Sequence, residues 1–353
     1  MKAFAITKQY ESVGWIDAPD PVCGPLDVIA TPVALAVCTS DPHQIHAGFP
    51  AGLVLGHEAV GRVVEVGSLV KNFKVGDIIS TCAVTPDWLT DEVQENNQAH
   101  CGGPLRAINW AAYENGTLAE KYRVRQADMN GIILPDDVTY DQALLAADMM
   151  TTGFHGVDLA RVQYGDIVVA CGIGAVGQMV VAGAALRGAS IIIGIGHREL
   201  TKKMAKDFGA NYIIDYKETP NIDEEVLKLT GGRAPDAVIF SGGNQDMYRR
   251  CVKMVRPNGY VSNLMGQNFD LLLPQADTFG FCYDKNLNGG LCPGGKARLE
   301  RMINMIRAGR IDPTPEVTHR FYGFDKIPEA YKCMDEKVDS EGNEVLKTVI
   351  YCE

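Results

Sequence analysis

The 353-residue chain lacks the features that mark several protein classes. No two of its 10 cysteines have C-x-x-C spacing, and there are too few of them for a disulfide scaffold in a chain of this length. No apolar run approaches the roughly 20 residues that a membrane-spanning helix needs. The N-terminus lacks the apolar core of a signal peptide. We therefore expect a protein of a reducing, cytoplasmic compartment with no membrane partner.

Positive charge is also scarce. The chain has 33 basic and 44 acidic residues, which gives a net charge of -11 at pH 7. This balance argues against nucleic acid or an anionic membrane surface as a partner. Hydrophobic residues make up 46% and charged residues 22% of the chain, as in ordinary globular proteins. The length favours two domains.

The two parts of the chain differ in their hydrophobic pattern. Before residue 150, β-branched alternation broken by Gly and Pro predicts strands at 27–37 and 57–68, and 71–80 is predicted to be a turn that enters a strand. After residue 152, apolar runs alternate with helical segments, so βαβ units and a buried parallel sheet are expected. The predicted segments are strands 166–174, 190–196, 211–216, 236–243 and 259–265, and helices 175–189 and 198–210. A helix over 297–310 and a final strand in 344–353 complete an α/β chain in which the second domain is inserted into the first.

Residues 172–177 carry the pattern G-x-G-x-x-G between a predicted strand and a predicted helix. This context is the one in which the pattern predicts a dinucleotide-binding loop. Gly172 would allow the tight turn, Gly174 the approach of the pyrophosphate, and Gly177 the close packing of helix on strand. Ala175 and Val176 would add N–H groups at the helix N-terminus. The alternative is a tight turn that binds nothing.

The end of the next predicted strand bears on the choice of cofactor. NAD enzymes usually place an acidic residue there for the ribose hydroxyl, whereas this chain has Gly196, His197 and Arg198. Arg198 could bind a 2′-phosphate through two N–H groups, and Tyr216 could close the same pocket. The alternative is a solvated Arg198 in a first helical turn, where the helix dipole disfavours a cation. The pattern favours NADP(H).

Metal-ligand residues precede the glycine loop. A thiolate, an imidazole and carboxylates suit zinc, and the candidates are Cys38, His57, Glu58 and Asp148. They are far apart in the sequence, so spacing alone does not group them. Taken singly, Cys38 could be a small buried residue, His57 a core histidine and Glu58 a surface acid.

Several longer motifs resemble one family. They are Cys-Thr-Ser-Asp at 38–41, Gly-His-Glu-Ala-Val-Gly at 56–61, Thr-Pro-Asp-Trp at 85–88, and the segments 148–156 and 289–295. The chain resembles the zinc-dependent medium-chain alcohol dehydrogenases, and among them the tetrameric NADP-dependent secondary-alcohol dehydrogenases of bacteria. The resemblance implies a GroES-like β-rich catalytic domain, residues 1–151 and 293–353. It also implies an inserted Rossmann domain with a doubly wound parallel sheet, residues 152–292, and a homotetramer.

The resemblance assigns roles position by position. The implied zinc ligands are Cys38, His57, Asp148 and, as a ligand that leaves or approaches when substrate exchanges, Glu58. Ser40 would pass the proton of the alcohol onward, and His43 would be the next relay group. Thr152 would contact a phosphate of the cofactor.

Two departures from the family pattern affect the expected site. The stretch that often holds a structural zinc on four cysteines has only Cys82 and Cys101, so one catalytic zinc and no structural zinc are expected. In the implied substrate pocket, a tryptophan is usual where this chain has Ile108. The implied pocket residues are Ala83, Ile108, Trp110 and Leu291.

The sequence thus predicts an enzyme that interconverts secondary alcohols and ketones by hydride transfer with NADP(H). One alternative is the same fold acting on a primary alcohol, an aldehyde or a polyol. Others are a zinc-free enone reductase and a cofactor-binding protein without turnover. A substrate profile separates the first alternative, metal analysis the second, and a turnover assay the third.

Overall fold

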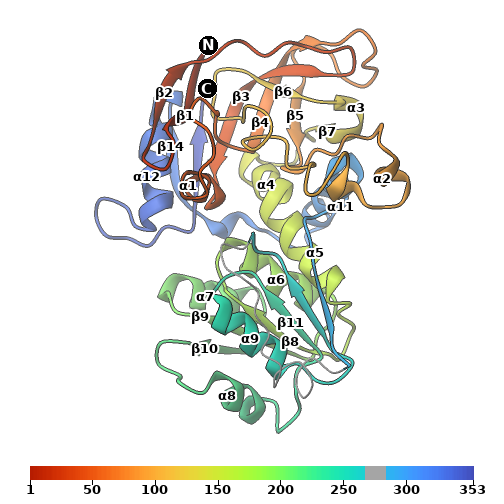
Figure 1. Cartoon of the computed structure of the whole chain (residues 1–353), viewed down its shortest axis with the longest axis vertical. Helices are drawn as coiled ribbons and strands as arrows, with labels where there is room; N and C mark the ends of the chain where they lie inside the picture. Colours follow the sequence, from red (N-terminus) through yellow and green to blue (C-terminus); the bar gives the residue numbers. More distant parts are fainter. Residues whose placement is uncertain (267–283) are drawn as a thin grey trace. The chain divides into compact units, whose positions relative to one another are not determined.

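The computed structural model describes residues 1–266 and 284–353 (Figure 1). The chain forms two compact units. The first combines Met1–Thr151 with Cys292–Glu353, and the second is Thr152–Leu291. None of the helices in the described ranges has both the length and the apolar character that crossing a bilayer requires.

A seven-stranded sheet forms the centre of the first unit. Its strand order is β14-β15-β3-β4-β5-β7, and β6 pairs with β3. The strands are β3 (Val28–Val37), β4 (Glu58–Val66), β5 (Ile78–Thr81), β6 (Tyr122–Val124), β7 (Gly131–Ile133), β14 (Val317–Tyr322) and β15 (Lys347–Tyr351). A separate antiparallel hairpin consists of β1 (Lys2–Lys8) and β2 (Ser12–Asp17). Val28, Leu35, Ile79 and Ile350 belong to the hydrophobic core of this unit.

Helices of the first unit are mostly short. The α-helices are α1 (Ser40–His46), α2 (Asp91–Gln94), α3 (Ala127–Asn130), α4 (Tyr140–Leu145), α11 (Gly295–Arg307) and α12 (Ile327–Glu336). The 3₁₀ turns are η1 (Gln98–His100), η3 (Thr314–Glu316) and η4 (Phe324–Lys326), and η2 (Ala146–Met150) is a π-helical turn. A further helix, α5 (Thr151–Leu159), follows η2 directly, and all of it except Thr151 belongs to the second unit.

The second unit contains a six-stranded parallel sheet. Its strand order is β10-β9-β8-β11-β12-β13, which in chain order is 3-2-1-4-5-6, the arrangement of a Rossmann fold. The strands are β8 (Ile167–Cys171), β9 (Ile191–Gly196), β10 (Tyr212–Asp215), β11 (Ala237–Phe240), β12 (Tyr260–Asn263) and β13 (Asn286–Gly289). In the described part of the chain, the helices between them are α6 (Ala175–Leu186), α7 (Glu199–Asp207), α8 (Ile222–Leu229) and α9 (Gln245–Met254). The predicted α/β class with a parallel sheet is confirmed.

The register of the first sheet places distant residues side by side. β3 and β4 are antiparallel, and Ala36 pairs with Glu58. Cys38 follows the end of β3, so it lies next to His57, which precedes β4. Hydrogen bonding of these two strands therefore joins two of the motifs that the sequence keeps apart.

A capped helix carries the third motif. Thr139 and Gln142 form a capping box at the start of α4, each side chain bonding the backbone of the other residue. The helix widens into the π-helical turn η2, which contains Asp148. π-Helical turns shift side chains relative to a regular helix and are frequent at functional sites.

Candidate functional site

The four predicted metal ligands come together in the first unit. One ligand atom from each of Cys38, His57, Glu58 and Asp148 lies within 4.8 Å of the others. Asp148 Oδ2 is 3.7 Å from Cys38 Sγ and 3.5 Å from His57 Nε2. His57 Nε2 is 3.8 Å from Glu58 Oε1.

These distances fit a tetrahedral zinc ion. With zinc–ligand bonds of about 2.0–2.3 Å, neighbouring ligand atoms of a tetrahedron lie about 3.3–3.8 Å apart. The measured pairs span 3.5–3.8 Å. One sulfur, one nitrogen and two carboxylates also match the chemistry of zinc. The side chains present could therefore hold one zinc ion without large movement.

A buried carboxylate, Asp41, organises the loops that bear two of these ligands. Its Oδ2 accepts a hydrogen bond from Cys38 N at 2.9 Å, and its Oδ1 accepts one from Gly56 N at 2.9 Å. Asp41 Oδ1 also lies 3.7 Å from His57 Nδ1. A carboxylate beside the outer nitrogen of a metal-binding histidine fixes the orientation of the ring. Asp41 belongs to the motif at 38–41, but the sequence alone predicted no role for it.

The backbone of Gly56 cannot accommodate a side chain. Its φ is +88°, and an added Cβ would lie 2.5 Å from Leu118 Cγ. Glycine is therefore required for the turn that brings His57 to the cluster.

The buried ionisable groups of the metal cluster shift one another's pKa values. Burial raises the pKa of Glu58 to about 7, against the opposing charge of Lys347. Burial alone would lower the pKa of His57, but its hydrogen bonds to Asp148 and Cys38 raise that pKa well above the ordinary value. Anionic groups around His57 thus favour a positive charge at this point, which a divalent cation would also supply.

Lys347 contacts the metal cluster through Glu58. It is 1% exposed, and its ammonium group donates a hydrogen bond to Glu58 Oε1. Burial disfavours the charge, but Glu58 and the other nearby anions raise the pKa of Lys347. The second oxygen of Glu58 is buried without a hydrogen-bond partner. Lys347 lies in the last strand, β15, and no local sequence pattern indicated it.

The two predicted relay residues lie on α1. Ser40 Oγ is 3.5 Å from His57 Nε2, so the hydroxyl borders the metal cluster. His43 is exposed; partial loss of solvent lowers its pKa, and Lys337 and His46 add to this effect. No direct hydrogen bond joins Ser40 to His43 among the described contacts, so a proton passing between them needs an intervening hydroxyl or water.

The glycine loop lies in the second unit as predicted, between β8 and α6. Gly172 has a φ of +89°, and an added Cβ would lie 2.5 Å from Gly242 N. A Cβ on Gly177 would lie 1.9 Å from Gly172 O. By contrast, a Cβ on Gly174 would meet nothing within 4 Å, so there is open space in front of this residue. Ala175 and Val176 are the first two residues of α6. The backbone N–H groups in the first turn of a helix have no carbonyl partner within that helix.

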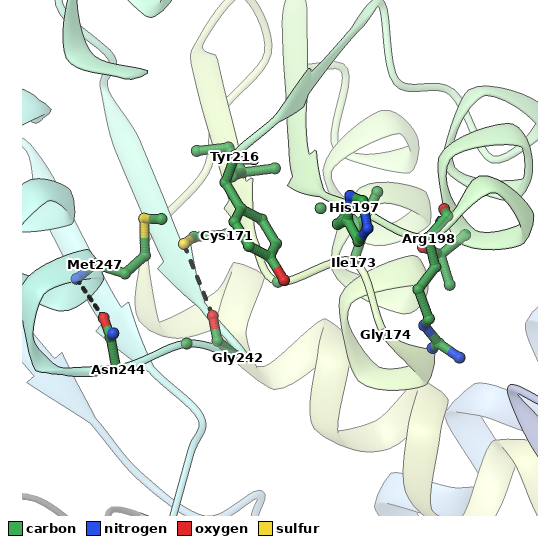
Figure 2. A pocket seen from close by; sticks show the side chains of 14 residues that line it. Cys171, Ile173, Gly174, His197, Arg198, Tyr216, Gly242, Asn244 and Met247 are labelled. Atoms are coloured by element: carbon green, nitrogen blue, oxygen red, sulfur yellow. Dashed lines mark hydrogen bonds between the residues drawn. The ribbon is translucent and has the colours of Figure 1, made fainter. Parts of the chain in front are cut away.

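A pocket of about 520 Å³ opens beside this loop (Figure 2). The predicted cofactor residues that line it are Gly172, Gly174, Gly196, His197, Arg198 and Tyr216. Residues that the sequence analysis did not single out also line it, among them Ile173, Thr201, Gly242, Asn244 and Met247. In the view of Figure 2, His197 lies between Tyr216 and Arg198.

Two polar residues missed by sequence reasoning support this pocket. Gln178 Nε2 donates to Ile173 O at 2.8 Å and to Thr201 O at 2.9 Å, so it ties the glycine loop to α7. Asp215, at the end of β10, lies 3.1 Å from His197 Nδ1 through each carboxylate oxygen. The sequence signal for Asp215 is an acidic residue at the end of a strand. The sequence analysis considered only the end of the preceding strand, at Gly196.

The remaining predicted residues have different surroundings. Thr152 is half-buried in α5. In the first unit Ala83 is buried and Ile108 half-buried, and Leu291 of the second unit is half-buried. Trp110 is 2% exposed within the hydrophobic core. Its indole N–H donates to Arg123 O at 2.9 Å, and its ring packs edge-on against Tyr122.

Comparisons with known proteins identify the family of the chain. Residues 24–135 match the alcohol dehydrogenase GroES-like domain, and residues 175–271 match the zinc-binding dehydrogenase domain. The chain is 44% identical to the NADP-dependent isopropanol dehydrogenases of Thermoanaerobacter brockii and Clostridium beijerinckii, over 96% of this chain and 97% of each relative.

The fold agrees as well. A solved structure of zinc dependent alcohol dehydrogenase 2 from Streptococcus pneumonia superimposes with a TM-score of 0.88 at 25% identity, covering 100% of this chain and 99% of that chain. On the two domain matches and the full-length similarity, the chain belongs to the zinc-dependent medium-chain alcohol dehydrogenase family.

Proposed function

We propose that this protein is an NADP-dependent secondary-alcohol dehydrogenase that interconverts secondary alcohols and ketones. The observation that carries the proposal is its similarity, over 96% of the chain, to two NADP-dependent isopropanol dehydrogenases. The metal cluster and the glycine-loop pocket supply the two sites that such a reaction needs.

We assign the zinc to Cys38, His57 and Asp148, with Glu58 as the exchangeable ligand. When bound, zinc lowers the pKa of an alcohol hydroxyl and polarises a ketone carbonyl. Asp41 holds the Cys38 and His57 loops in place. Lys347 stabilises the charge of Glu58 while this carboxylate is withdrawn from the metal. One catalytic zinc and no structural zinc are proposed per chain.

Ser40 is proposed to accept the proton of the alcohol, because its hydroxyl lies beside His57. His43, exposed on the same helix, passes that proton to solvent. In the ketone direction the same groups return a proton. A bound nicotinamide cofactor would supply the hydride chemistry.

The cofactor is proposed to bind in the glycine-loop pocket. Gly172, Gly174 and Gly177 shape the loop, and Ala175 and Val176 offer N–H groups to the pyrophosphate. Thr152 is a proposed phosphate contact. Gly196, His197, Arg198 and Tyr216 surround the adenosine end, where Arg198 binds the 2′-phosphate.

The two units have separate roles in the proposed reaction. We propose that residues 1–151 and 293–353 are the catalytic domain and that residues 152–292 bind the cofactor. The substrate is a small alcohol or ketone, with Ala83, Ile108, Trp110 and Leu291 proposed near it. A homotetramer is proposed from the family resemblance, and a cytoplasmic location from the cysteine usage of the chain.

A steady-state screen tests the function. Small ketones, aldehydes and a polyol are offered with NADPH or NADH, or with the oxidised cofactors for the alcohols. Acetone and 2-propanol with the NADP couple should give the highest kcat/KM. Elemental analysis should find about one zinc per chain, and Cys38→Ser should lose both zinc and activity. Higher activity on sorbitol or ethanol, or full activity without zinc, would contradict the proposal.

A further inference from the structure

His197 and Asp215 form a polar pair at the wall of the glycine-loop pocket. Parallel pairing of β9 with β10 matches Gly196 with Asp215, so His197 follows directly beside that carboxylate. His197 Nδ1 is 3.1 Å from each carboxylate oxygen. The Asp215 side chain is 7% exposed, whereas that of His197 is 38% exposed and can exchange protons with solvent.

Asp215 remains a carboxylate because other donors surround it. Lys202 Nζ donates to Oδ2 at 2.9 Å, and Lys217 N donates to Oδ1 at 3.0 Å. The hydrogen bond from Lys202 lowers the pKa of Asp215, and those from Lys217 N and His197 act in the same direction. A permanent carboxylate keeps the proton on His197 Nδ1. Nε2 is then the ring nitrogen whose protonation can change.

We propose that His197 takes up a proton on Nε2 when NADP(H) binds and donates this proton in a hydrogen bond to the 2′-phosphate. The preference for NADP over NAD then depends on pH and weakens as pH rises. This inference rests on the proposed use of NADP by the same pocket. The proton comes from solvent, and no covalent bond of the cofactor changes. His197 therefore acts on the choice between NADP and NAD and not on the chemical step.

The charged groups around the His197 imidazole permit this protonation. Asp215 is balanced by Lys202, which also pairs with the exposed Glu199 at 2.5 Å. Tyr216 contributes its ring, edge-on to His197 with centroids 5.8 Å apart. Arg198 lines the same pocket and adds a positive charge. A 2′-phosphate brings about two negative charges above pH 6, and a second cation beside Arg198 offsets them.

The expected linkage has a definite sign. Bound phosphate favours the charged form of His197, so protonation of the ring and binding of NADP(H) strengthen each other. The added affinity is present at low pH, where the ring can carry the proton, and is lost as pH rises. A charge-assisted hydrogen bond corresponds to about tenfold or more in affinity. The ratio of NAD to NADP dissociation constants should therefore fall about tenfold between pH 6.5 and pH 9.

Calorimetric titration of the full-length protein with NADP⁺ and NAD⁺ tests this inference. At pH 7.5, in two buffers of different ionisation enthalpy, NADP⁺ binding should take up part of a proton and NAD⁺ binding much less. His197→Gln should abolish the difference and flatten the pH dependence, while Arg198 preserves some NADP preference. His319→Gln is the matched control, because His319 also lies near an aspartate, 3.2 Å from Asp339, in the other unit.

The outcomes separate the two proposals. Equal proton uptake in the unmodified protein and in His197→Gln would overturn only the role of His197 and not the proposed cofactor. An NADP preference that is constant with pH would have the same consequence. Absence of any NADP preference from pH 6.5 to pH 9 would overturn the proposed cofactor as well. Loss of the linkage in His319→Gln would also count against His197, because it would place the proton elsewhere.

Discussion

Lys347 donates a hydrogen bond to Glu58 in the interior of the first unit, with side-chain exposures of 1% and 0%. Glu58 is at the same time one of the four residues of the metal cluster. The lysine therefore offers this carboxylate a second charged partner, away from the metal. Neither residue can be removed alone without leaving a buried charge unpaired.

Lys347→Met should destabilise the protein strongly. Breaking a buried ion pair by removing one partner typically costs about 3–5 kcal/mol. The double variant Glu58→Gln, Lys347→Met removes both charges and should recover much of that loss. Urea unfolding of the metal-free proteins measures both effects.

Lys332→Met is the matched control for this experiment. Lys332 faces Glu336 at 3.8 Å on the surface of α12, with 71% and 51% exposed side chains. An exposed pair of this kind contributes about 0–1 kcal/mol. Equal losses in Lys332→Met and Lys347→Met would show that burial does not determine the importance of the Glu58 pair.

Glu316→Gln should stabilise the protein in a pH-dependent way. Glu316 is fully buried, neither carboxyl oxygen has a hydrogen-bond partner, and burial raises its pKa well above the ordinary value. An unfolded glutamate ionises near pH 4.3. Above that pH the unfolded state releases a proton that the folded state retains, so stability falls as pH rises toward the folded pKa.

The difference in unfolding free energy between Glu316→Gln and the unmodified protein should thus be small near pH 4.5 and grow toward pH 8. Urea unfolding of the metal-free proteins at both pH values measures it, and titrations shared by the two proteins cancel. Glu300→Gln, at an exposed surface pair with Lys296, should show no such trend. A difference that stays constant with pH would mean that Glu316 is ionised in the fold.

Ser40→Ala should lower kcat while zinc stays bound. Its hydroxyl lies 3.5 Å from His57 Nε2 but supplies no ligand atom to the cluster. Loss of a positioned proton-transfer group typically costs about 10²–10⁴ in rate. Zinc content by elemental analysis should be unchanged, and NADPH affinity should remain within about twofold. Loss of the metal from this variant would identify Ser40 as part of the metal site.

Local sequence signals were sufficient for the Rossmann part of the fold. The apolar runs at 166–174 and 190–196 became β8 and β9, and the segment between them became α6. These elements are predictable because buried parallel strands read as continuous apolar runs and the glycines mark the turn between strand and helix. The N-terminal hairpin of β1 and β2 was not predicted, since its strands bear no such markers.

The candidate site was less predictable than the fold. The resemblance named the metal-ligand motifs, but only the register of β3 on β4 explains why Cys38 and His57 meet. Asp41 and Lys347 act through contacts between residues far apart in the chain, which no local pattern encodes. Trp110, which the resemblance places near the substrate pocket, packs in the hydrophobic core, and this packing also depends on contacts between distant parts of the chain.

Two substitutions in the glycine-loop pocket bear on how it distinguishes NADP from NAD. Gly196→Asp would place a negative charge near the 2′-phosphate, but its Cβ would lie 2.2 Å from Ile173 Cγ1. A loss of binding in that variant would mix a steric collision with a charge effect. Arg198→Ala avoids the collision, because it shortens a side chain that lines the pocket.

Arg198→Ala should weaken NADP about ten- to a hundredfold and leave NAD within about twofold, because charge-assisted hydrogen bonds to the phosphate contribute about 1.5–3 kcal/mol. The ratio of kcat/KM for NADPH and NADH on one ketone at pH 7.5 measures the change. Arg187→Ala, which removes a surface partner of Asp158 in the same unit, should leave this ratio unchanged. If Arg198→Ala weakens both cofactors equally, this guanidinium supports the pocket without recognising the phosphate, and the NADP preference must come from His197 and Tyr216.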